Sequence, residues 1–338
     1  MSRVYHFGPS SDYVGGMGSV IAILSQLSLG ADRVIAVPTW VPTSHLRSGW
    51  LAARALLHVR GLRGEDVVHV HMSEGGSFVR EAAIVAAAKR RGLRLVITIH
   101  GADFASFSAR RPSLVGRVLG MASAVTVLSE VDLAIVRRLA PRVRAEILPN
   151  PTPIDPLSGP ASDTPELALF AGEVGLRKGA DVLQRAWEAV AARRPHAHCV
   201  VVGPATALQL PPTERLEVRG PVSSSAVREL IRGARVIALP SRGEALPMIL
   251  TEAMAAGRPF VSTATGGTSA LADGGLIVPI DDHLALADAL VALLADPERA
   301  QALGSAGRSL CQQWMSPEAV DARLRQLYGR PASATAPR

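Results

Sequence analysis

Residues 241–260, SRGEALPMILTEAMAAGRPF, place one acidic residue in a loop and a second on the helix predicted to follow it. The run just before them, RVIALPS (235–241), has the apolar, β-branched composition of a buried strand. Pro247 suits the first turn of a helix, and Gly257 suits the residue after a helix end. The stretch therefore predicts a strand, an acidic loop and a helix, which is the repeating unit of a parallel α/β sheet.

The same alternation of short apolar runs and Ala/Leu-rich stretches continues through all 338 residues. Continuous apolar strands separated by helices are typical of parallel sheets covered on both faces. Six strand candidates in each half predict two Rossmann-like α/β domains that face each other across a cleft. The candidates are 4–9, 33–38, 67–72, 93–100, 124–129 and 145–150, then 167–174, 198–205, 216–222, 235–241, 259–264 and 274–280.

A proline-rich, polar segment over residues 151–166 lies between the two halves. Its composition predicts a semi-rigid linker. We therefore predict one domain over 1–150, a second over 167–312 and a last helix over 313–330.

The net charge of +7 is unevenly placed. Residues 1–150 hold 18 Arg and Lys against 10 Asp and Glu, a balance of +8, while the remainder holds 18 against 19, a balance of −1. Such an excess indicates an anionic partner or, alternatively, only a solvated arginine-rich surface. Aromatic residues are 4 % and no nucleic-acid-binding motif is present, so we expect no nucleic acid and favour a membrane surface or an acidic substrate. The basic clusters are Lys89-Arg90-Arg91, Arg94, Arg110-Arg111 and Arg137-Arg138.

Other features concern location and cofactors. No apolar run approaches the roughly 18 residues that span a bilayer, and the first residues lack the pattern of a signal peptide. Cys199 and Cys311 show no disulfide framework and no metal-ligand spacing, and no Asp-x-Asp motif is present. We expect a cytoplasmic protein, peripheral on the inner face of the cytoplasmic membrane if it binds lipid, with no metal and no cofactor.

The two acids of the opening stretch suit a ligand with hydroxyl pairs at both ends. Glu252 lies about 7 Å beyond the helix start, from five residues at about 1.5 Å each. The helix N-terminus offers free N–H groups, those of Met248 and Ile249, to an anion, and a carboxylate accepts two hydroxyl hydrogen bonds. A nucleotide sugar fits this layout. Its hexose hydroxyls would lie at Glu244, its diphosphate at the helix start and its ribose hydroxyls at Glu252. The alternative is an ordinary amphipathic helix with an acid in the preceding loop.

Three further stretches follow predicted strands. In FAGEVGLRKGADVL (170–183), Arg177 and Lys178 stand at a strand-to-helix turn, where two cations suit a diphosphate. In YVGGMGSV (13–20), three glycines allow a backbone to approach a ligand closely. Taken alone, such a stretch is more often a plain turn. His100 leaves a strand and is expected at the ligand edge of the sheet. His71 and Glu74 are expected at the exit of the neighbouring strand.

The stretch 241–259, SRGEALPMILTEAMAAGRP, resembles the signature S-x-x-E-x-L-P-M-x-x-x-E-A-M-A-x-G-x-P of the family 4 retaining nucleotide-sugar glycosyltransferases, which have the GT-B fold. Lys178-Gly179 is similar to the end of a second family pattern, G-R-L-x-x-x-K-G. Glu173 stands where that pattern has its Arg, and Arg177 is expected to supply the lost charge. Residues 67–84 resemble transferases that build bacterial surface polysaccharides.

The resemblance implies roles for individual residues. Glu244, His100 and Lys178 would be the catalytic residues, with Glu244 and His100 beside the sugar. In the family the last helix crosses back to the first domain. The donor-binding set implied is Gly15, Gly16, Arg177, Lys178, Val222 at the nucleobase, Leu246, Pro247, Met248, and Glu252 on the ribose; the acceptor side would hold Met17, His71 and Glu74.

The resemblance implies transfer of a hexose-type sugar from a nucleotide-diphosphate donor with retention of anomeric configuration. We expect a lipid-linked saccharide in surface-polysaccharide assembly as the acceptor. The alternatives are glycosylation of a soluble natural product, another GT-B activity such as a nucleotide-sugar epimerase or a phosphorylase, and a non-catalytic nucleotide-sugar-binding relative.

Overall fold

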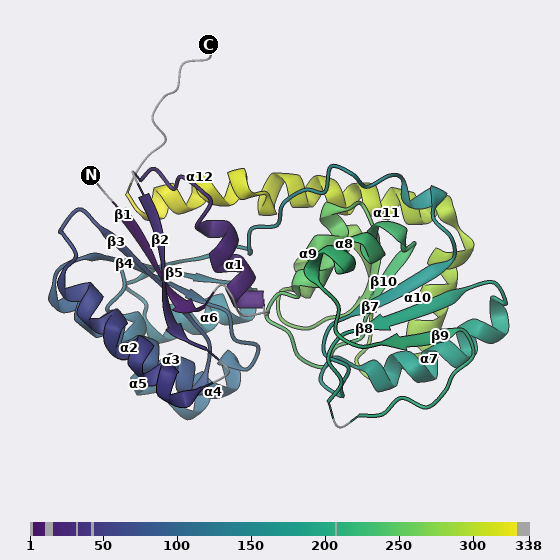
Figure 1. The fold of residues 1–338 in the computed structure, drawn as a ribbon, viewed down its shortest axis with the longest axis horizontal. Coiled ribbons are helices and arrows are strands. Elements are labelled where there is room, and N and C mark those ends of the chain that lie inside the picture. Colours follow the sequence, from purple (N-terminus) through teal and green to yellow (C-terminus); the bar gives the residue numbers. More distant parts are fainter. Residues whose placement is uncertain (1–2, 11–15, 32, 42–43, 207, 330–338) are drawn as a thin grey trace, which may run out of the picture. The chain divides into compact units, whose positions relative to one another are not determined.

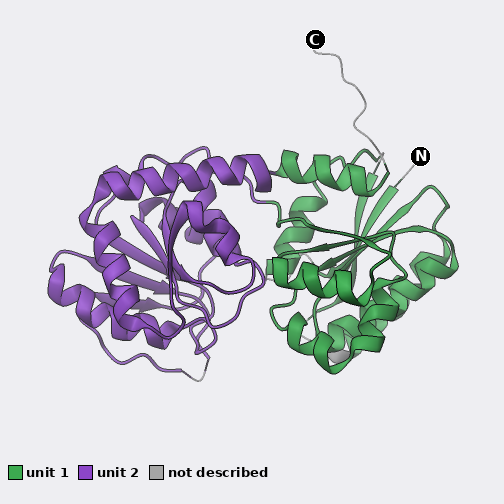
Figure 2. Ribbon diagram, turned by 180° about the vertical axis from the view of Figure 1, so that it is seen from behind, with its two compact units in different colours: residues 1–151, 317–338 green, residues 152–316 purple. Residues whose placement is uncertain are grey.

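The structure is a computed structural model that describes residues 3–10, 16–31, 33–41, 44–206 and 208–329. It divides into two compact units, one of residues 1–151 with 317–338 and one of residues 152–316 (Figure 2). In each unit, helices flank one six-stranded parallel sheet (Figure 1). The two units are called unit 1 and unit 2 below.

Unit 1 has the strand order β2-β1-β3-β4-β5-β6, and every pairing is parallel. Strands β3 and β5 are buried along their whole length, which explains their unbroken apolar sequences. The strands are β1 Arg3–Pro9, β2 Arg33–Trp40, β3 Val67–Met72, β4 Arg94–Ile99, β5 Ala124–Val127 and β6 Arg144–Ile147. The helices are α1 Gly16–Leu24, α2 His45–Arg60, α3 Gly75–Arg90, α4 Phe104–Arg110, α5 Pro112–Leu119, α6 Glu130–Leu139 and α12 Pro317–Leu327.

Unit 2 has the strand order β12-β11-β10-β7-β8-β9, again parallel throughout. Its strands are β7 Leu167–Ala171, β8 His198–Val202, β9 Leu216–Arg219, β10 Val236–Leu239, β11 Phe260–Thr263 and β12 Gly275–Val278. Its helices are α7 Ala180–Arg193, α8 Ser224–Gly233, α9 Met248–Ala255, α10 His283–Ala295 and α11 Pro297–Leu310, followed by a π-helical turn, η3, at Cys311–Met315.

The order of the strands reverses at one point in each sheet. In unit 1, β2 lies on one side of β1, and β3 to β6 lie on the other. In unit 2, β8 and β9 lie on one side of β7, and β10 to β12 lie on the other. Ligands of such sheets bind outside the carboxyl ends of the strands at this switch point. The loops after β1, β3, β7 and β10 are therefore where sites are expected.

The predicted fold class is confirmed, because all twelve strand candidates are strands of two parallel sheets. Several predicted strands end earlier in the structure. The candidate 124–129 ends at Val127 because Ser129 turns to cap α6, where its hydroxyl accepts the N–H of Asp132 at 3.1 Å. The chain divides at 151/152 and 316/317, so unit 2 begins within the predicted linker and the last helix, α12, belongs to unit 1.

Candidate functional site

The loops after β7 and β10 bring three charged side chains together in unit 2. The Lys178 ammonium lies 2.6 Å from a carboxylate oxygen of Glu244, and both side chains are largely buried. The Ser241 hydroxyl donates a hydrogen bond of 2.7 Å to the same oxygen. Arg177, which is half exposed, places a guanidinium nitrogen 3.7 Å from it and donates to the Gly243 carbonyl. The carboxylate of Glu244 is thus held by a hydroxyl and two cations.

Two glycines with positive φ make this arrangement possible. A Cβ atom on Gly179 (φ 72°) would lie 1.9 Å from the Pro240 carbonyl oxygen. A Cβ atom on Gly266 (φ 52°) would lie 2.0 Å from the carbonyl oxygen of Glu244. Backbone therefore packs directly on backbone here, which only glycine permits, and this contact sets Lys178 beside Glu244.

A second ion pair fixes the same two loops. Arg242, next to Ser241, donates two hydrogen bonds of 2.8 Å to the Asp181 carboxylate in the first turn of α7. The Arg242 N–H also donates to the carbonyl of Arg177 at 2.8 Å. Neither residue was predicted, because the pairing joins positions 61 residues apart and depends on the strand order.

Helix α9 follows the acidic loop directly. Pro247 is the residue before the helix rather than part of its first turn, and Gly257 follows its end with φ 67°. Among the described residues, no group accepts the N–H of Met248 or Ile249, as expected for the first turn of a helix. This end of α9 can therefore bind an anion.

Glu252 lies one turn further along α9. Burial raises the pKa of its carboxyl to about 7, although nearby Arg228 acts in the opposite direction. Leu246 is buried, and Val222 lies half-buried in the loop between β9 and α8, a helix that packs against α9. The predicted donor residues of unit 2 thus follow one another from the switch point along α9, with Val222 on a separate loop.

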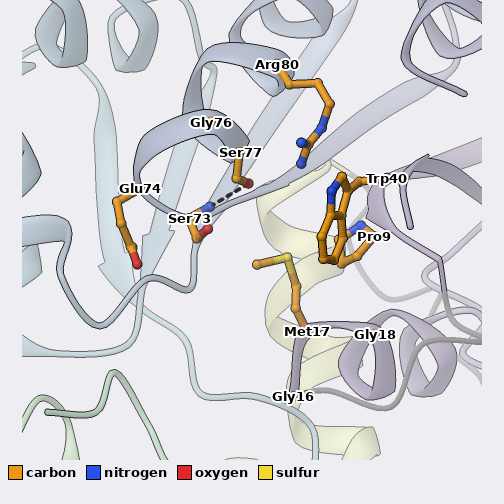
Figure 3. Close-up of a pocket in the computed structure, with 10 residues that line it drawn as sticks. All are labelled: Pro9, Gly16, Met17, Gly18, Trp40, Ser73, Glu74, Gly76, Ser77 and Arg80. Carbon is orange, nitrogen blue, oxygen red and sulfur yellow. Dashed lines mark hydrogen bonds between the residues drawn. The ribbon is translucent and has the colours of Figure 1, made fainter. Parts of the chain in front are cut away.

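The switch point of unit 1 carries a cavity of about 650 Å³. Of the predicted residues, Gly16, Met17 and Glu74 line it, and Gly15 lies outside the described residues. Figure 3 shows Glu74 on one side of the cavity, with Trp40 and Arg80 on the other. The remaining lining residues are Pro9, Gly18, Trp40, Ser73, Gly76, Ser77 and Arg80.

The sequence reasoning missed Trp40 and Arg80. The Arg80 guanidinium lies 6.0 Å above the Trp40 ring, and its Nε donates a hydrogen bond of 2.9 Å to the buried Glu81 carboxylate. Glu81 also accepts from the hydroxyls of Thr39 (2.5 Å) and Ser77 (3.1 Å). No described residue pairs with the two terminal nitrogens of Arg80, which are held toward the cavity (Figure 3).

The Glu74 side of the cavity is acidic. Burial raises the pKa of the Glu74 carboxyl, and one of its oxygens is buried with no partner among the described residues. A Cβ atom on Gly101, which follows His100, would lie 1.6 Å from that oxygen, so the glycine leaves room for the carboxylate.

His71 is the last residue but one of β3, which ends at Met72 as the predicted strand does, and its ring is buried. Its role on the acceptor side stays a prediction. Its two nitrogens lie 2.9 Å from His6 Nδ1 and 2.9 Å from His100 Nε2, so the three rings form a hydrogen-bonded chain. His71 does not line the 650 Å³ cavity. His100 follows β4 directly, as predicted, and is half-buried. Burial lowers the pKa of all three imidazoles, to about 3 for His6 and about 4 for His100.

His6, His69 and His71 place nitrogens within 4.8 Å of one another, a spacing that could hold a metal ion. Hydrogen bonds already occupy most of these nitrogens. His69 pairs with the hydroxyls of Tyr328 and Thr98 at 2.6 Å each, and only His6 Nε2 lacks a partner among the described residues. These residues fit an internal hydrogen-bond network better than a metal site, and a metal-free reaction stays a prediction.

Most of the basic clusters predicted for the N-terminal half lie at the ends of helices. Lys89-Arg90, Arg110 and Arg137-Arg138 occupy the last turns of α3, α4 and α6, where cations favour the negative end of the helix dipole. Arg91 donates to the Leu62 carbonyl, and Arg94 donates twice to the Leu327 carbonyl. Part of the basic excess thus serves the fold itself.

The two Rossmann-like units and the switch-point loops with paired acids and cations define a glycosyltransferase of the GT-B class. Residues 165–296 match the family model "Glycosyl transferases group 1", and residues 24–151 match the "Glycosyl transferase 4-like domain". The chain is 32 % identical over 303 residues to the D-inositol 3-phosphate glycosyltransferase of Xylanimonas cellulosilytica, a match that covers 77 % of this chain and 70 % of that protein. The chain belongs to the group 1 glycosyltransferases, of the family 4 type.

Two other similarities extend the comparison. A GDP-mannose-dependent monoacylated alpha-(1-6)-phosphatidylinositol monomannoside mannosyltransferase of Corynebacterium glutamicum is 29 % identical over 178 residues, 48 % of this chain and 47 % of that protein. The structure of sucrose-phosphate synthase from Thermosynechococcus elongatus matches the fold with a TM-score of 0.75 at 20 % identity, over 97 % of this chain and 98 % of that one.

Proposed function

We propose that this glycosyltransferase moves a hexose from a nucleotide-diphosphate sugar to its acceptor with retention of anomeric configuration. The observation that carries the proposal is the Lys178–Glu244 pair at the switch point of unit 2, followed directly by the open N-terminus of α9. A relative with a GDP-mannose-dependent activity supports a nucleotide sugar as the donor.

Each part of the donor then has a partner in unit 2. The ribose hydroxyls bind the Glu252 carboxylate, and the base lies at the loop of Val222. The diphosphate binds the first N–H groups of α9 together with Lys178 and Arg177, because cations and helix N-termini both favour anions. Glu244 accepts the hydroxyls of the sugar.

The chemical step relies on charge and position. Lys178 and the α9 N–H groups stabilise the negative charge that develops on the departing diphosphate. The leaving diphosphate takes the proton of the acceptor hydroxyl on the face from which it departs, so the new bond forms on that face and the configuration is retained. His100, in its neutral form, hydrogen bonds to the sugar. Holding both substrates in position lowers the barrier further.

We place the acceptor in the 650 Å³ cavity of unit 1. Trp40 offers a flat aromatic face to a sugar ring, Glu74 accepts hydroxyl groups, and the terminal nitrogens of Arg80 suit an anion at the other side. An anionic, lipid-linked saccharide has all three features. Relatives that act on an inositol phosphate and on a phosphatidylinositol mannoside support a phosphorylated acceptor. A soluble sugar or polyol phosphate is the alternative.

The test is release of nucleoside diphosphate from UDP-glucose, UDP-N-acetylglucosamine and GDP-mannose, with and without acceptor probes. The probes are inositol, inositol 3-phosphate, and a polyprenyl-diphosphate-linked saccharide. Release that requires an acceptor supports a transferase. Epimerised donor, phosphorolysis when inorganic phosphate is added, or tight donor binding without turnover would each replace the proposal with the corresponding alternative.

Arg80→Met tests the acceptor site in the same assay. We expect kcat/KM for a phosphorylated acceptor to fall about tenfold to a hundredfold, the range for a charge-assisted hydrogen bond, while an unphosphorylated analogue is little affected. An equal loss for both acceptors would contradict the role of Arg80.

A further inference from the structure

Helix α2, over His45–Arg60, has an apolar stripe on the face that its own core contacts do not use. Its inward face, with Leu51, Ala55 and Val59, is buried in unit 1. The stripe consists of Leu46, Trp50 and Leu57, which are 90 %, 59 % and 61 % exposed.

Spacing shows that these three residues share one face. They are separated by four and seven positions, so they follow one another along a single side of the helix, with exposed Ala53 between the last two. Isolated exposed apolar residues are normal on protein surfaces. A row of three over about three turns is different, because it forms a continuous apolar strip that some partner can cover.

The charge of α2 indicates the kind of partner. Exposed Arg47, Arg54 and Arg60 lie beside the stripe, and the helix contains no acidic residue. The Arg54 guanidinium lies 5.4 Å above the Trp50 ring, in a cation–π contact that puts the charge directly beside the stripe. An apolar strip on a helix whose charged residues are all arginines fits an anionic lipid surface. It suits a second copy of the chain poorly, because two such helices would bring arginine against arginine.

We propose that α2 is the element by which the protein lies on an anionic membrane, with Leu46, Trp50 and Leu57 inserted at the level of the lipid headgroups. Tryptophan favours this interfacial zone, and the flanking arginines bind the anionic headgroups. The inference rests on the proposed function, since it explains how a lipid-linked acceptor is reached.

The test is co-sedimentation with phosphatidylcholine vesicles that contain or lack phosphatidylglycerol, at low and physiological salt. The wild-type protein is expected to bind the anionic vesicles, more weakly as salt rises. The triple variant Leu46→Ser, Trp50→Ser, Leu57→Ser should bind at least about a hundredfold more weakly. Arg47→Gln with Arg54→Gln should lose the preference for anionic lipid. Leu284→Ser in unit 2, which removes a residue with 60 % exposure, is the matched control and should bind normally.

A second measurement separates this inference from the proposed function. The triple variant is assayed for transfer to the soluble probe inositol 3-phosphate, and its oligomeric state is measured by analytical ultracentrifugation. Equal vesicle binding by variant and wild type would overturn the role of α2 and leave the transferase proposal intact. So would a wild-type dimer that the variant loses without any vesicle binding, because the stripe would then be an interface between copies. Lost vesicle binding with unchanged transfer to the soluble probe supports docking by α2.

Discussion

At the scale of single residues, the pKa of Glu252 makes a prediction about pH. A carboxyl with a pKa of about 7 is half protonated at neutral pH, and ribose hydroxyls donate to its ionised form. Donor affinity should therefore fall as the pH is lowered, by about tenfold between roughly pH 8 and pH 6. Titration calorimetry with UDP-glucose and GDP-mannose measures this, because neither donor titrates in that range. Glu252→Gln should bind weakly with no pH dependence, and a wild-type affinity that is flat with pH would contradict the ribose assignment.

We expect substitutions of Lys178 and Arg177 to lower kcat by different amounts. Lys178→Ala should lower kcat by at least about a hundredfold, the scale for one group that stabilises developing charge. Arg177→Ala should cost less, because Arg177 is half exposed and lies 3.7 Å from Glu244 rather than 2.6 Å. If Arg177 replaces the charge absent at position 173, then Glu173→Arg should restore activity to Arg177→Ala. An Arg177→Ala variant with wild-type kcat would disprove that compensation.

The sequence allowed some of these residues to be predicted and not others. Only seven residues separate Glu244 in the loop from Glu252 on the helix, so closeness in sequence places both acids near one helix start. The contact of Arg80 with Trp40 and the partners of His71 are not local. His71 meets His6, 65 positions away, only because β1 and β3 are neighbours in the sheet, and no sequence period reports that pairing.

At the scale of the elements, the loop between β7 and α7 predicts the effect of a single methyl group. Gly179→Ala would place Cβ 1.9 Å from the Pro240 carbonyl oxygen at a positive φ. We expect a loss of more than about 1 kcal/mol in the free energy of unfolding, together with weaker donor binding because Lys178 is displaced. Gly243→Ala, in the facing loop, is the control, since no atom lies within 4 Å of its added Cβ. Thermal denaturation and donor titration compare the two, and equal behaviour would show that the backbone contact does not position Lys178.

The presence of each strand was predicted better than the residues at which strands and helices begin and end. Buried parallel strands are unmistakable in composition, and all twelve were found. Their ends depend on capping: Ser129 leaves its predicted strand to cap α6, and Pro247 precedes α9 instead of entering it. The apolar stripe of α2 was missed because sequence shows which residues share a face but not which face is already buried.

At the scale of the whole molecule, acid should destabilise unit 1 selectively. The three hydrogen-bonded imidazoles of this unit include His6 and His100, with pKa values of about 3 and about 4. An unfolded histidine has a pKa of about 6.5. Because the folded pKa is the lower one, the unfolded state binds more protons below pH 6.5, and stability is lost as the pH falls from there toward 4. The loss is about 1.4 kcal/mol per pH unit for each such imidazole.

Hydrogen exchange at about pH 8 and pH 5, corrected for intrinsic rates, measures this effect by unit. Amides of unit 1 should lose protection at the lower pH before those of unit 2, in which His196 and His198 are exposed. His6→Met should reduce the pH dependence of unit 1. An equal loss of protection in both units would contradict the account.

The central claim, retaining transfer from a nucleotide sugar, is tested most directly by the anomeric configuration of the product. The reaction is run with 13C-labelled UDP-glucose or GDP-mannose, whichever supports acceptor-dependent release, and the anomeric carbon is followed by NMR. The account predicts a glycoside with the configuration of the α-linked donor, formed in step with nucleoside diphosphate and lost in Lys178→Ala. A product of inverted configuration, or nucleotide release with no glycoside formed, would contradict it.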